Sequence, residues 1–214
     1  MKTDDPKFEQ IARQVRQKLQ VGGCHDFDHT LRVMHLAEQL LQTEPAANRD
    51  VVRYAALLHD IARPEEYAGN GKVCHALLGA EIAAELLKNS GFPTGFTEHV
   101  AAVIAEHRFR SDHHPQTLES WIVHDADKLD SLGACGIGRA FLFAGRCGAR
   151  LHNRESEALA GKAYGPEDTA YREYLIKLRH LPERIHTAGG KKIAAERLQL
   201  METFFAALNQ EVYG

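Results

Sequence analysis

The amino-acid sequence predicts an all-α protein. Apolar residues recur every three or four positions along most of the 214 residues, which is typical of amphipathic helices. No stretch of the sequence alternates apolar and polar residues as a half-buried strand does. The segment of about residues 48–62 is apolar almost all round, as expected of a helix at the centre of a bundle. A chain of this length can bury one substantial core, so we expect a single domain.

The expected helices follow one another with short connections. They cover about residues 5–20, 28–42, 48–62, 73–89, 97–108, 117–131, 168–178 and 190–211. Aspartates stand where an N-cap opens the second of these helices, and this residue type is strongly preferred at such positions. Pro64 ends the third, because proline cannot continue a helix interior.

Three stretches are expected to lack regular helix. The polar segment Arg63–Lys72 is predicted to be a loop, and glycines punctuate the chain at positions 133, 136 and 138. Residues 145–168 show no convincing periodicity and contain four further glycines. We interpret this last segment as a mobile loop that is helical in part.

Composition excludes several classes of function. The net charge of -3 and a pI near 6.5 argue against a protein that binds a nucleic acid duplex, and we interpret the short cluster Arg108–Arg110 as a solvated surface. No secretory signal or membrane-spanning run is recognisable, so we expect a cytoplasmic protein without membrane contact. The 4 cysteines form no C-x-x-C pair and predict neither a disulfide framework nor a zinc finger.

His59 and Asp60 interrupt the most apolar of the predicted helices. Burying two adjacent polar side chains is unfavourable unless a partner satisfies both, and a desolvated carboxylate is especially costly. A bound metal cation would satisfy the pair. The 13 histidines of the chain also favour a search for metal ligands.

Other predicted helices place a histidine or an aspartate among apolar residues. These candidates are His29, His75, His107, Asp125 and Asp127. Helical spacing does not choose between Asp125 and Asp127, and His25 competes with His29, which heads an apolar stripe. Mixed imidazole and carboxylate ligands suit divalent Mn, Fe, Co, Ni or Mg rather than a thiolate-bound structural zinc.

Three motifs together resemble a known family. They are His25-Asp-Phe-Asp-His29-Thr-Leu-Arg32-Val33, Leu58-His59-Asp60-Ile61 and Asp125-Ala126-Asp127-Lys128-Leu129-Asp130. In this order they resemble the HD superfamily of metal-dependent phosphohydrolases, in particular small stand-alone bacterial members, some of which hydrolyse nucleoside triphosphates. The resemblance implies a single HD domain over residues 1–214, with a core of about residues 24–132 and a C-terminal helical extension of about residues 133–214.

The resemblance also implies a ligand set and a reaction. His29, His59, Asp60 and Asp127 would bind a divalent ion, one per chain. The implied activity is hydrolysis of a small phosphorylated substrate, a nucleoside triphosphate or monophosphate, by attack of a metal-activated water on phosphorus. The sequence makes no prediction of oligomeric state.

Cations near the expected ligands are candidates for catalysis. Arg32, Arg63 and Lys128 each lie within one helical turn of a proposed ligand and could stabilise charge on the phosphoryl oxygens. For Arg63, a structural salt bridge is an equal alternative.

Acids and further histidines complete the expected site. Glu65, Glu66 or Asp130 could serve as general acid or base, and of these we assign Glu66. The side chains expected to contact the substrate are His25, His75, His107 and Asp130.

Two other functions stay open at the level of sequence. His75 and His107 stand in the order used by superfamily members that hold two metals, some of which are oxygenases, so a dinuclear-iron oxygenase is one alternative. The other is a non-catalytic module that senses a nucleotide.

We also expect Asp60→Ala to lose the metal and to stabilise the metal-free protein, because a buried carboxylate without its cation is unfavourable.

Overall fold

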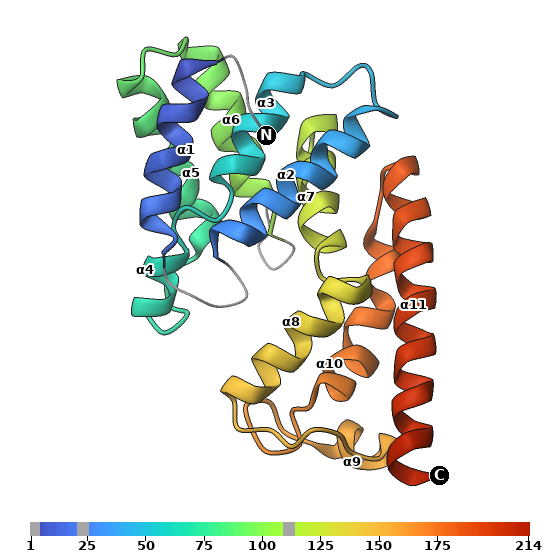
Figure 1. Cartoon of the computed structure of the whole chain (residues 1–214). Helices are drawn as coiled ribbons and strands as arrows, with labels where there is room; N and C mark the ends of the chain where they lie inside the picture. The colour runs from blue at the N-terminus through green and yellow to red at the C-terminus, as the bar shows by residue number, and fades with distance from the viewer. Residues whose placement is uncertain (1–4, 21–25, 109–113) are drawn as a thin grey trace. The chain divides into compact units, whose positions relative to one another are not determined.

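The computed structural model describes residues 5–20, 26–108 and 114–214, and every regular element within these ranges is a helix (Figure 1). The all-α prediction is confirmed. The chain divides into two compact units, which we call the first unit (Met1–Asp127) and the second unit (Lys128–Gly214). Among the described helices, none combines the length and the apolar character needed to cross a membrane.

The first unit is built around one buried helix. Its elements are α1 (Pro6–Lys18), α2 (Phe27–Leu41), α3 (Arg49–Leu58), α4 (Arg63–Ala68), α5 (His75–Asn89), α6 (Thr94–Glu106) and most of α7 (Leu118–Leu129). Helix α3 contacts α1, α2 and α6, while α5 packs along α6. Seven of the ten residues of α3 are buried, which matches the prediction of a central helix.

Polar caps fix where the helices of the first unit begin. The Asp26 carboxylate accepts the backbone N–H of His29 at 3.0 Å and so starts α2 with His29 in its first turn. Asn48 caps α3 in the same way, and its own N–H donates to Glu119 Oε1 at 2.7 Å. The beginnings of α3 and α7 are therefore tied together.

The segment after α3 differs from the prediction. Helix α3 ends at Leu58, and residues 59–62 form tight turns before α4 begins at Arg63. The polar segment predicted to be a loop therefore contains a short helix. Pro64 stands in the first turn of α4, where proline is tolerated because its missing N–H would have no helical partner. Because α3 already ends at Leu58, the proline that was expected to stop this helix instead lies in the first turn of the next one.

The second unit is also helical. It contains α8 (Gly133–Arg146), α9 (Glu155–Ala160), α10 (Ala170–Ile176), a 3₁₀ helix (Leu178–Arg184) and α11 (Ala188–Tyr213). Helix α11 packs against α8 and the 3₁₀ helix, and α10 packs against α8 and α9. The rings of Tyr171 and Tyr174 lie 5.5 and 4.6 Å from that of Phe205, so aromatic contacts join α10 to α11.

Contrary to the prediction, the glycines that follow residue 132 do not interrupt helical structure. Gly133 has a φ of 73° and begins α8, while Gly136 and Gly138 lie inside it. A Cβ at Gly136 would lie 2.2 Å from the carbonyl oxygen of Ser131, so only glycine fits there. At Gly138 the corresponding space is open.

The segment of residues 145–168 carries internal contacts. It includes the end of α8 and the whole of α9. Arg150 Nη2 lies 2.6 Å from Glu167 Oε2, and Asn153 Nδ2 donates to the carbonyl oxygen of Glu167 at 3.1 Å. The partial helix near residues 155–159 is confirmed, and the mobility of the segment stays a prediction.

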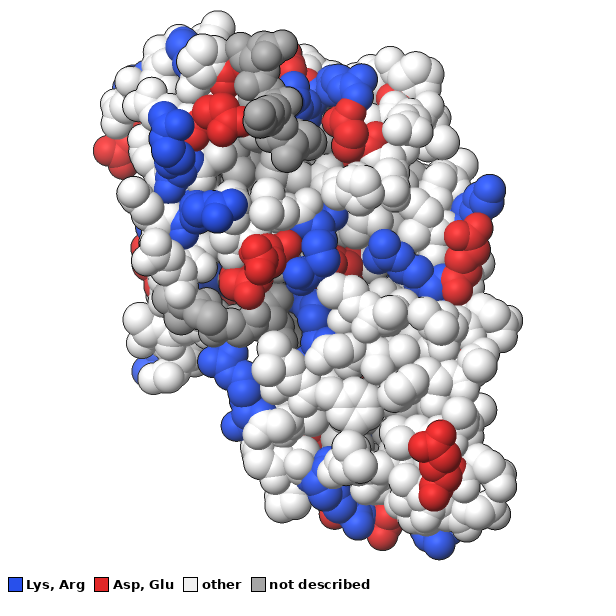
Figure 2. All heavy atoms as spheres, in the orientation of Figure 1, with Lys and Arg blue, Asp and Glu red and all other residues white. Residues whose placement is uncertain are grey.

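Charged side chains are mixed on the surface. On the face drawn in Figure 2, the Lys and Arg side chains of the described residues are interspersed with Asp and Glu. This distribution accords with the small net charge of -3.

Candidate metal centre

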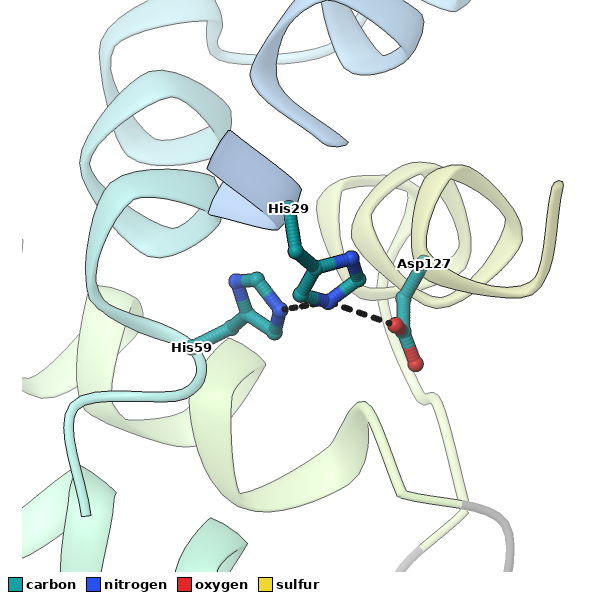
Figure 3. Close-up of side chains that lie close together, drawn as sticks. All are labelled: His29, His59 and Asp127. Atoms are coloured by element: carbon teal, nitrogen blue, oxygen red, sulfur yellow. Dashed lines mark hydrogen bonds and ion pairs between the residues drawn. The ribbon is translucent and has the colours of Figure 1, made fainter. Parts of the chain in front are cut away.

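Three helices bring together a first cluster of buried ligands, His29, His59 and Asp127 (Figure 3). His29 comes from the first turn of α2, His59 from the end of α3 and Asp127 from α7. His29 Nε2 lies 3.3 Å from His59 Nε2 and 3.4 Å from Asp127 Oδ1. These separations are short enough for one small cation to contact all three groups.

A second cluster lies beside the first and consists of Asp60, His75 and His107. His75 opens α5, and His107 directly follows α6. His75 Nε2 lies 3.2 Å from His107 Nε2 and 3.3 Å from Asp60 Oδ1. All three residues are at most 1% exposed. Substrate contact by both histidines stays a prediction, and the structure places them against the carboxylate of Asp60, as the two-metal alternative requires.

Asp60 faces both clusters with different oxygens. Its Oδ2 lies 3.5 Å from His29 Nε2 and 3.6 Å from His59 Nε2. Its Oδ1 lies 3.3 Å from His75 Nε2 and 3.8 Å from His107 Nε2. One carboxylate therefore stands between two groups of imidazoles.

Hydrogen bonds on the far sides of two rings orient the histidines. His59 Nδ1 lies 2.8 Å from the carbonyl oxygen of Ala56, and His107 Nδ1 lies 2.6 Å from that of Ile104. A carbonyl only accepts, so both Nδ1 atoms carry the hydrogen and both Nε2 atoms present a lone pair. Together with the carboxylates of Asp60 and Asp127, these lone pairs make the centre rich in acceptors. Such a donor set fits a divalent cation.

Burial keeps His59 and His75 in the form that can bind a metal. It lowers the pKa of His59 to about 4 and the pKa of His75 to about 3, although the charge of Asp60 opposes the effect at both. Both imidazoles are therefore neutral at pH 7. A metal would not have to displace a proton from either ring at that pH.

A network of charged side chains surrounds the second cluster. Arg63 Nε donates to Asp60 Oδ1 at 2.8 Å, and its Nη1 donates to Glu66 Oε2 at 2.7 Å. Arg108 Nη1 donates to Glu66 Oε1 at 2.6 Å. Burial alone would raise the pKa of Glu66, but His75 and Arg63 outweigh it and lower that pKa to about 2. The Glu66 carboxylate is therefore ionised, with cations on both oxygens.

These contacts bear on the roles expected for Arg63 and Glu66. The Arg63 guanidinium is bound between two carboxylates, which corresponds to the salt-bridge alternative. An ionised Glu66 held by two arginines is a poor proton donor at neutral pH. The proximity of both residues to the centre nevertheless follows the prediction, since each lies within 4 Å of a member of the second cluster.

The structure places the remaining candidates as follows. Arg32 lies one turn after His29 on α2 and is partly exposed. Lys128 directly follows Asp127 on α7, and in the second unit Asp130 accepts from Arg139 Nη1 at 2.6 Å. His25 lies outside the described residues.

The two aspartates of α7 that were candidate ligands contact different neighbours. Asp125 Oδ1 lies 3.2 Å from Nδ1 of the neighbouring His124, and both residues are fully buried. Asp127, by contrast, lies next to His29. The structure thus brings to the first cluster the aspartate that the family resemblance indicated.

Sequence reasoning missed Arg108. It was expected on a solvated surface, but its side chain is only 22% exposed and pairs with Glu66. The available signal was its position directly after His107, a candidate ligand. A basic residue adjacent in sequence to an inward-facing histidine is well placed to pair with an acid at the same site.

Comparison with known proteins identifies the family. Residues 26–132 match the model of the HD domain, which spans the first cluster and the second cluster alike. The chain belongs to the HD domain family. This membership confirms the resemblance drawn from the three motifs, and it extends the HD domain of this chain over α2 to α7.

Relatives of this HD protein cover its full length. It is 30% identical to YpgQ of Bacillus subtilis over 96% of this chain and 94% of YpgQ. The crystal structure of YpgQ in complex with ADP has a TM-score of 0.75 at 27% identity and covers 97% of this chain and 96% of that chain. A predicted HD superfamily hydrolase from an uncultured Thermotogales bacterium has a TM-score of 0.68 at 28% identity, covering 96% and 93%. Family, relatives and clusters together support a metal-dependent hydrolase.

Proposed function

We propose that this HD protein is a metal-dependent phosphohydrolase that acts on a nucleotide. The observation that carries the proposal is the acceptor-rich centre formed by the first cluster and the second cluster, with Asp60 between them. The ADP complex of YpgQ supports a nucleotide as the substrate, because YpgQ resembles this chain along its whole length. We propose His29, His59, Asp60 and Asp127 as ligands of the ion.

The proposed reaction is the transfer of a phosphoryl group to water. A bound divalent ion lowers the pKa of a water molecule and withdraws charge from a phosphoryl oxygen. The oxygen of an attacking water would form a bond to phosphorus while the bond from phosphorus to the leaving oxygen breaks, and the water would give up one proton to solvent. A phosphate or diphosphate leaving group departs as an anion, so the reaction needs no strong acid.

The chain's own residues divide the remaining work. Asp127 has the most exposed side chain of the two clusters, at 12% against at most 1% for the other five members. We therefore propose that water and substrate approach the centre beside Asp127. Arg32 and Lys128 are the cations that we propose to contact phosphoryl oxygens, because Arg63 is already held by two carboxylates.

The two clusters also bear on the number of ions. The sequence predicted one ion per chain, whereas His75, His107 and Asp60 offer ligand atoms that lie within 4.8 Å of one another beside the first cluster. We propose that the first cluster binds one ion and the second cluster binds another, with Asp60 contacting both. Elemental analysis of purified protein measures this directly, and a maximum of one ion per chain at saturating metal would refute it.

The activity is tested on purified full-length protein. Mn²⁺, Co²⁺, Ni²⁺ and Mg²⁺ are each supplied with nucleoside tri-, di- and monophosphates, and the release of phosphate and pyrophosphate is measured. We expect turnover that falls at least about 100-fold in His59→Ala, which removes a proposed ligand. His35→Ala is the matched control, since His35 is exposed on α2 and its ring lies 3.0 Å from the Gln39 amide, away from both clusters. Metal-loaded protein that releases neither product from any nucleotide would refute the proposal.

A dinuclear-iron oxygenase is the second candidate, and the second cluster is the observation that favours it. Two irons per chain together with oxygen consumption in the presence of a reductant would establish it. Nucleotide binding without turnover would instead indicate a sensing module. Wild-type turnover that is lost in both His59→Ala and Asp60→Ala excludes that module.

A further inference from the structure

His75 receives contacts at both ring nitrogens. Its Nε2 faces the second cluster, at 3.3 Å from Asp60 Oδ1 and 3.2 Å from His107 Nε2. Its Nδ1 lies 3.1 Å from Glu66 Oε2 and 3.3 Å from Arg108 Nη1. A carboxylate only accepts and a guanidinium only donates. The two contacts at Nδ1 therefore require opposite protonation of that atom.

The choice between them decides whether His75 can bind a metal. If Arg108 donates to Nδ1, the hydrogen of a neutral ring sits on Nε2 and points at Asp60 and His107. If Glu66 accepts from Nδ1, the hydrogen sits there and the lone pair of Nε2 faces the second cluster. Only the second tautomer supplies a metal ligand.

We propose that Glu66 is a positioning residue that holds His75 in the metal-binding tautomer. This inference rests on the proposed function in that it concerns the ion of the second cluster. The geometry favours Glu66 over Arg108 because His75 Nδ1 lies closer to Glu66 Oε2, at 3.1 Å, than to Arg108 Nη1, at 3.3 Å. Arg63 donates to the other oxygen of Glu66 at 2.7 Å, so two guanidinium groups fix the carboxylate beside Nδ1.

The position of His75 in its helix explains why a side chain has this task. His59 and His107 each use the carbonyl of the residue three positions earlier as acceptor for Nδ1, namely Ala56 and Ile104. Those carbonyls belong to the last turns of α3 and α6. His75 is the first residue of α5, so no helical turn precedes it. Glu66 of α4 takes the place of the missing carbonyl.

Glu66 is also linked to Asp60, the acid of the second cluster. Arg63 donates to Glu66 Oε2 at 2.7 Å and to Asp60 Oδ1 at 2.8 Å, so it links the two carboxylates. Asp60 Oδ1 is the oxygen that faces His75 and His107. Glu66 contacts Arg63, Arg108 and His75, and none of these three residues belongs to the first cluster. Loss of Glu66 should therefore weaken one ion and spare the other.

The test combines metal binding with the protonation of one ring. Chelator-treated full-length protein is titrated with Mn²⁺ alone by calorimetry, and the ¹⁵N NMR shifts of the His75 ring report its tautomer. In wild type we expect two binding events and a hydrogen on Nδ1. In Glu66→Gln and Glu66→Ala we expect one event to weaken about 10- to 100-fold, which is typical when the partner of a ligand histidine is lost. The hydrogen of His75 should then move to Nε2, because Arg108 can donate to Nδ1.

Glu65→Gln is the matched control. It removes the same charge from the same helix, but Glu65 pairs with Lys18 Nζ at 2.6 Å rather than with the second cluster. Both ions and the tautomer should be unchanged in this variant. The ion of the first cluster, retained in the Glu66 variants, reports that they are folded.

Each contrary result has a separate meaning. Glu66 variants that bind both ions like wild type, that lose both together, or that keep the hydrogen on Nδ1 would overturn the role of Glu66 and leave the proposed function standing. Wild type that binds no Mn²⁺ at all would overturn the proposed function itself.

Discussion

Removing the carboxylate of Asp60 tests how the metal-free centre is stabilised. The sequence alone predicts that Asp60→Ala stabilises the metal-free protein, because a buried acid without a cation is unfavourable. The structure reverses this expectation. Arg63 Nε lies 2.8 Å from Asp60 Oδ1, so the acid has a cation whether or not a metal is bound.

The magnitude follows from the burial of the pair. Asp60 has a side chain that is 1% exposed and Arg63 one that is 14% exposed. Removing one partner of a buried ion pair costs about 3–5 kcal/mol. Arg63 keeps its bond to Glu66 at 2.7 Å, so we expect a smaller loss, of about 2–3 kcal/mol in the free energy of unfolding.

The assay is urea unfolding in the presence of chelator. Fluorescence follows Trp121, the chain's single tryptophan, which lies on α7 within the first unit. Asp50→Ala is the control because Asp50 lies on the same helix that leads to Asp60 but has a side chain that is 71% exposed, and we expect a change within about 0.5 kcal/mol. If metal-free Asp60→Ala is as stable as wild type or more stable, Arg63 does not neutralise Asp60 and our reasoning fails.

Three further perturbations have expected outcomes. Gly136→Ala should destabilise the second unit by about 1–3 kcal/mol in thermal unfolding, because its Cβ would collide with the Ser131 carbonyl, whereas Gly138→Ala in the same helix should stabilise it by up to about 1 kcal/mol. Burial raises the pKa of Glu119, but the N–H of Asn48 and other partners outweigh it and lower this pKa below 4.5. The ionised carboxylate therefore stabilises the fold above pH 4.5, and this stabilisation is lost as the pH falls further. The difference in unfolding free energy between wild type and Glu119→Gln should accordingly shrink below pH 4.5. Chelation of an ion held at 100 times its Kd should lower the unfolding free energy by about 2.7 kcal/mol, and an unchanged unfolding curve would contradict metal binding by the folded state.

The sequence predicted those parts of the centre that depend on local pattern. His29 could be identified because it stands in the first turn of an N-capped amphipathic helix, and His59 because it directly follows the most apolar helix of the chain. The short helix α4 was missed because Pro64 was treated as the end of a helix rather than as a first-turn residue. Proline is compatible with both positions, so its presence alone does not distinguish them.

Contacts between helices far apart in sequence could not be derived from spacing. Glu66 and His75 meet only because α4 packs against α5, and Arg108 reaches Glu66 across 42 positions of sequence. Asp127 could be separated from Asp125 only by family resemblance, since both are buried on the same helix and differ in the direction they face. Periodicity defines the buried side of a helix but does not define which neighbour lies there.

The position of Asp60 has a consequence for how the protein responds to its surroundings. Because one carboxylate offers an oxygen to each cluster, two ions would share a single negative charge and repel one another across it. If both clusters bind an ion as proposed, occupation of either one would lower the affinity of the other for its ion, and the effect would be reciprocal. The protein would pass through a half-loaded state over a range of free-metal concentrations. Supply of the ion would thus set the balance between the half-loaded and the fully loaded states.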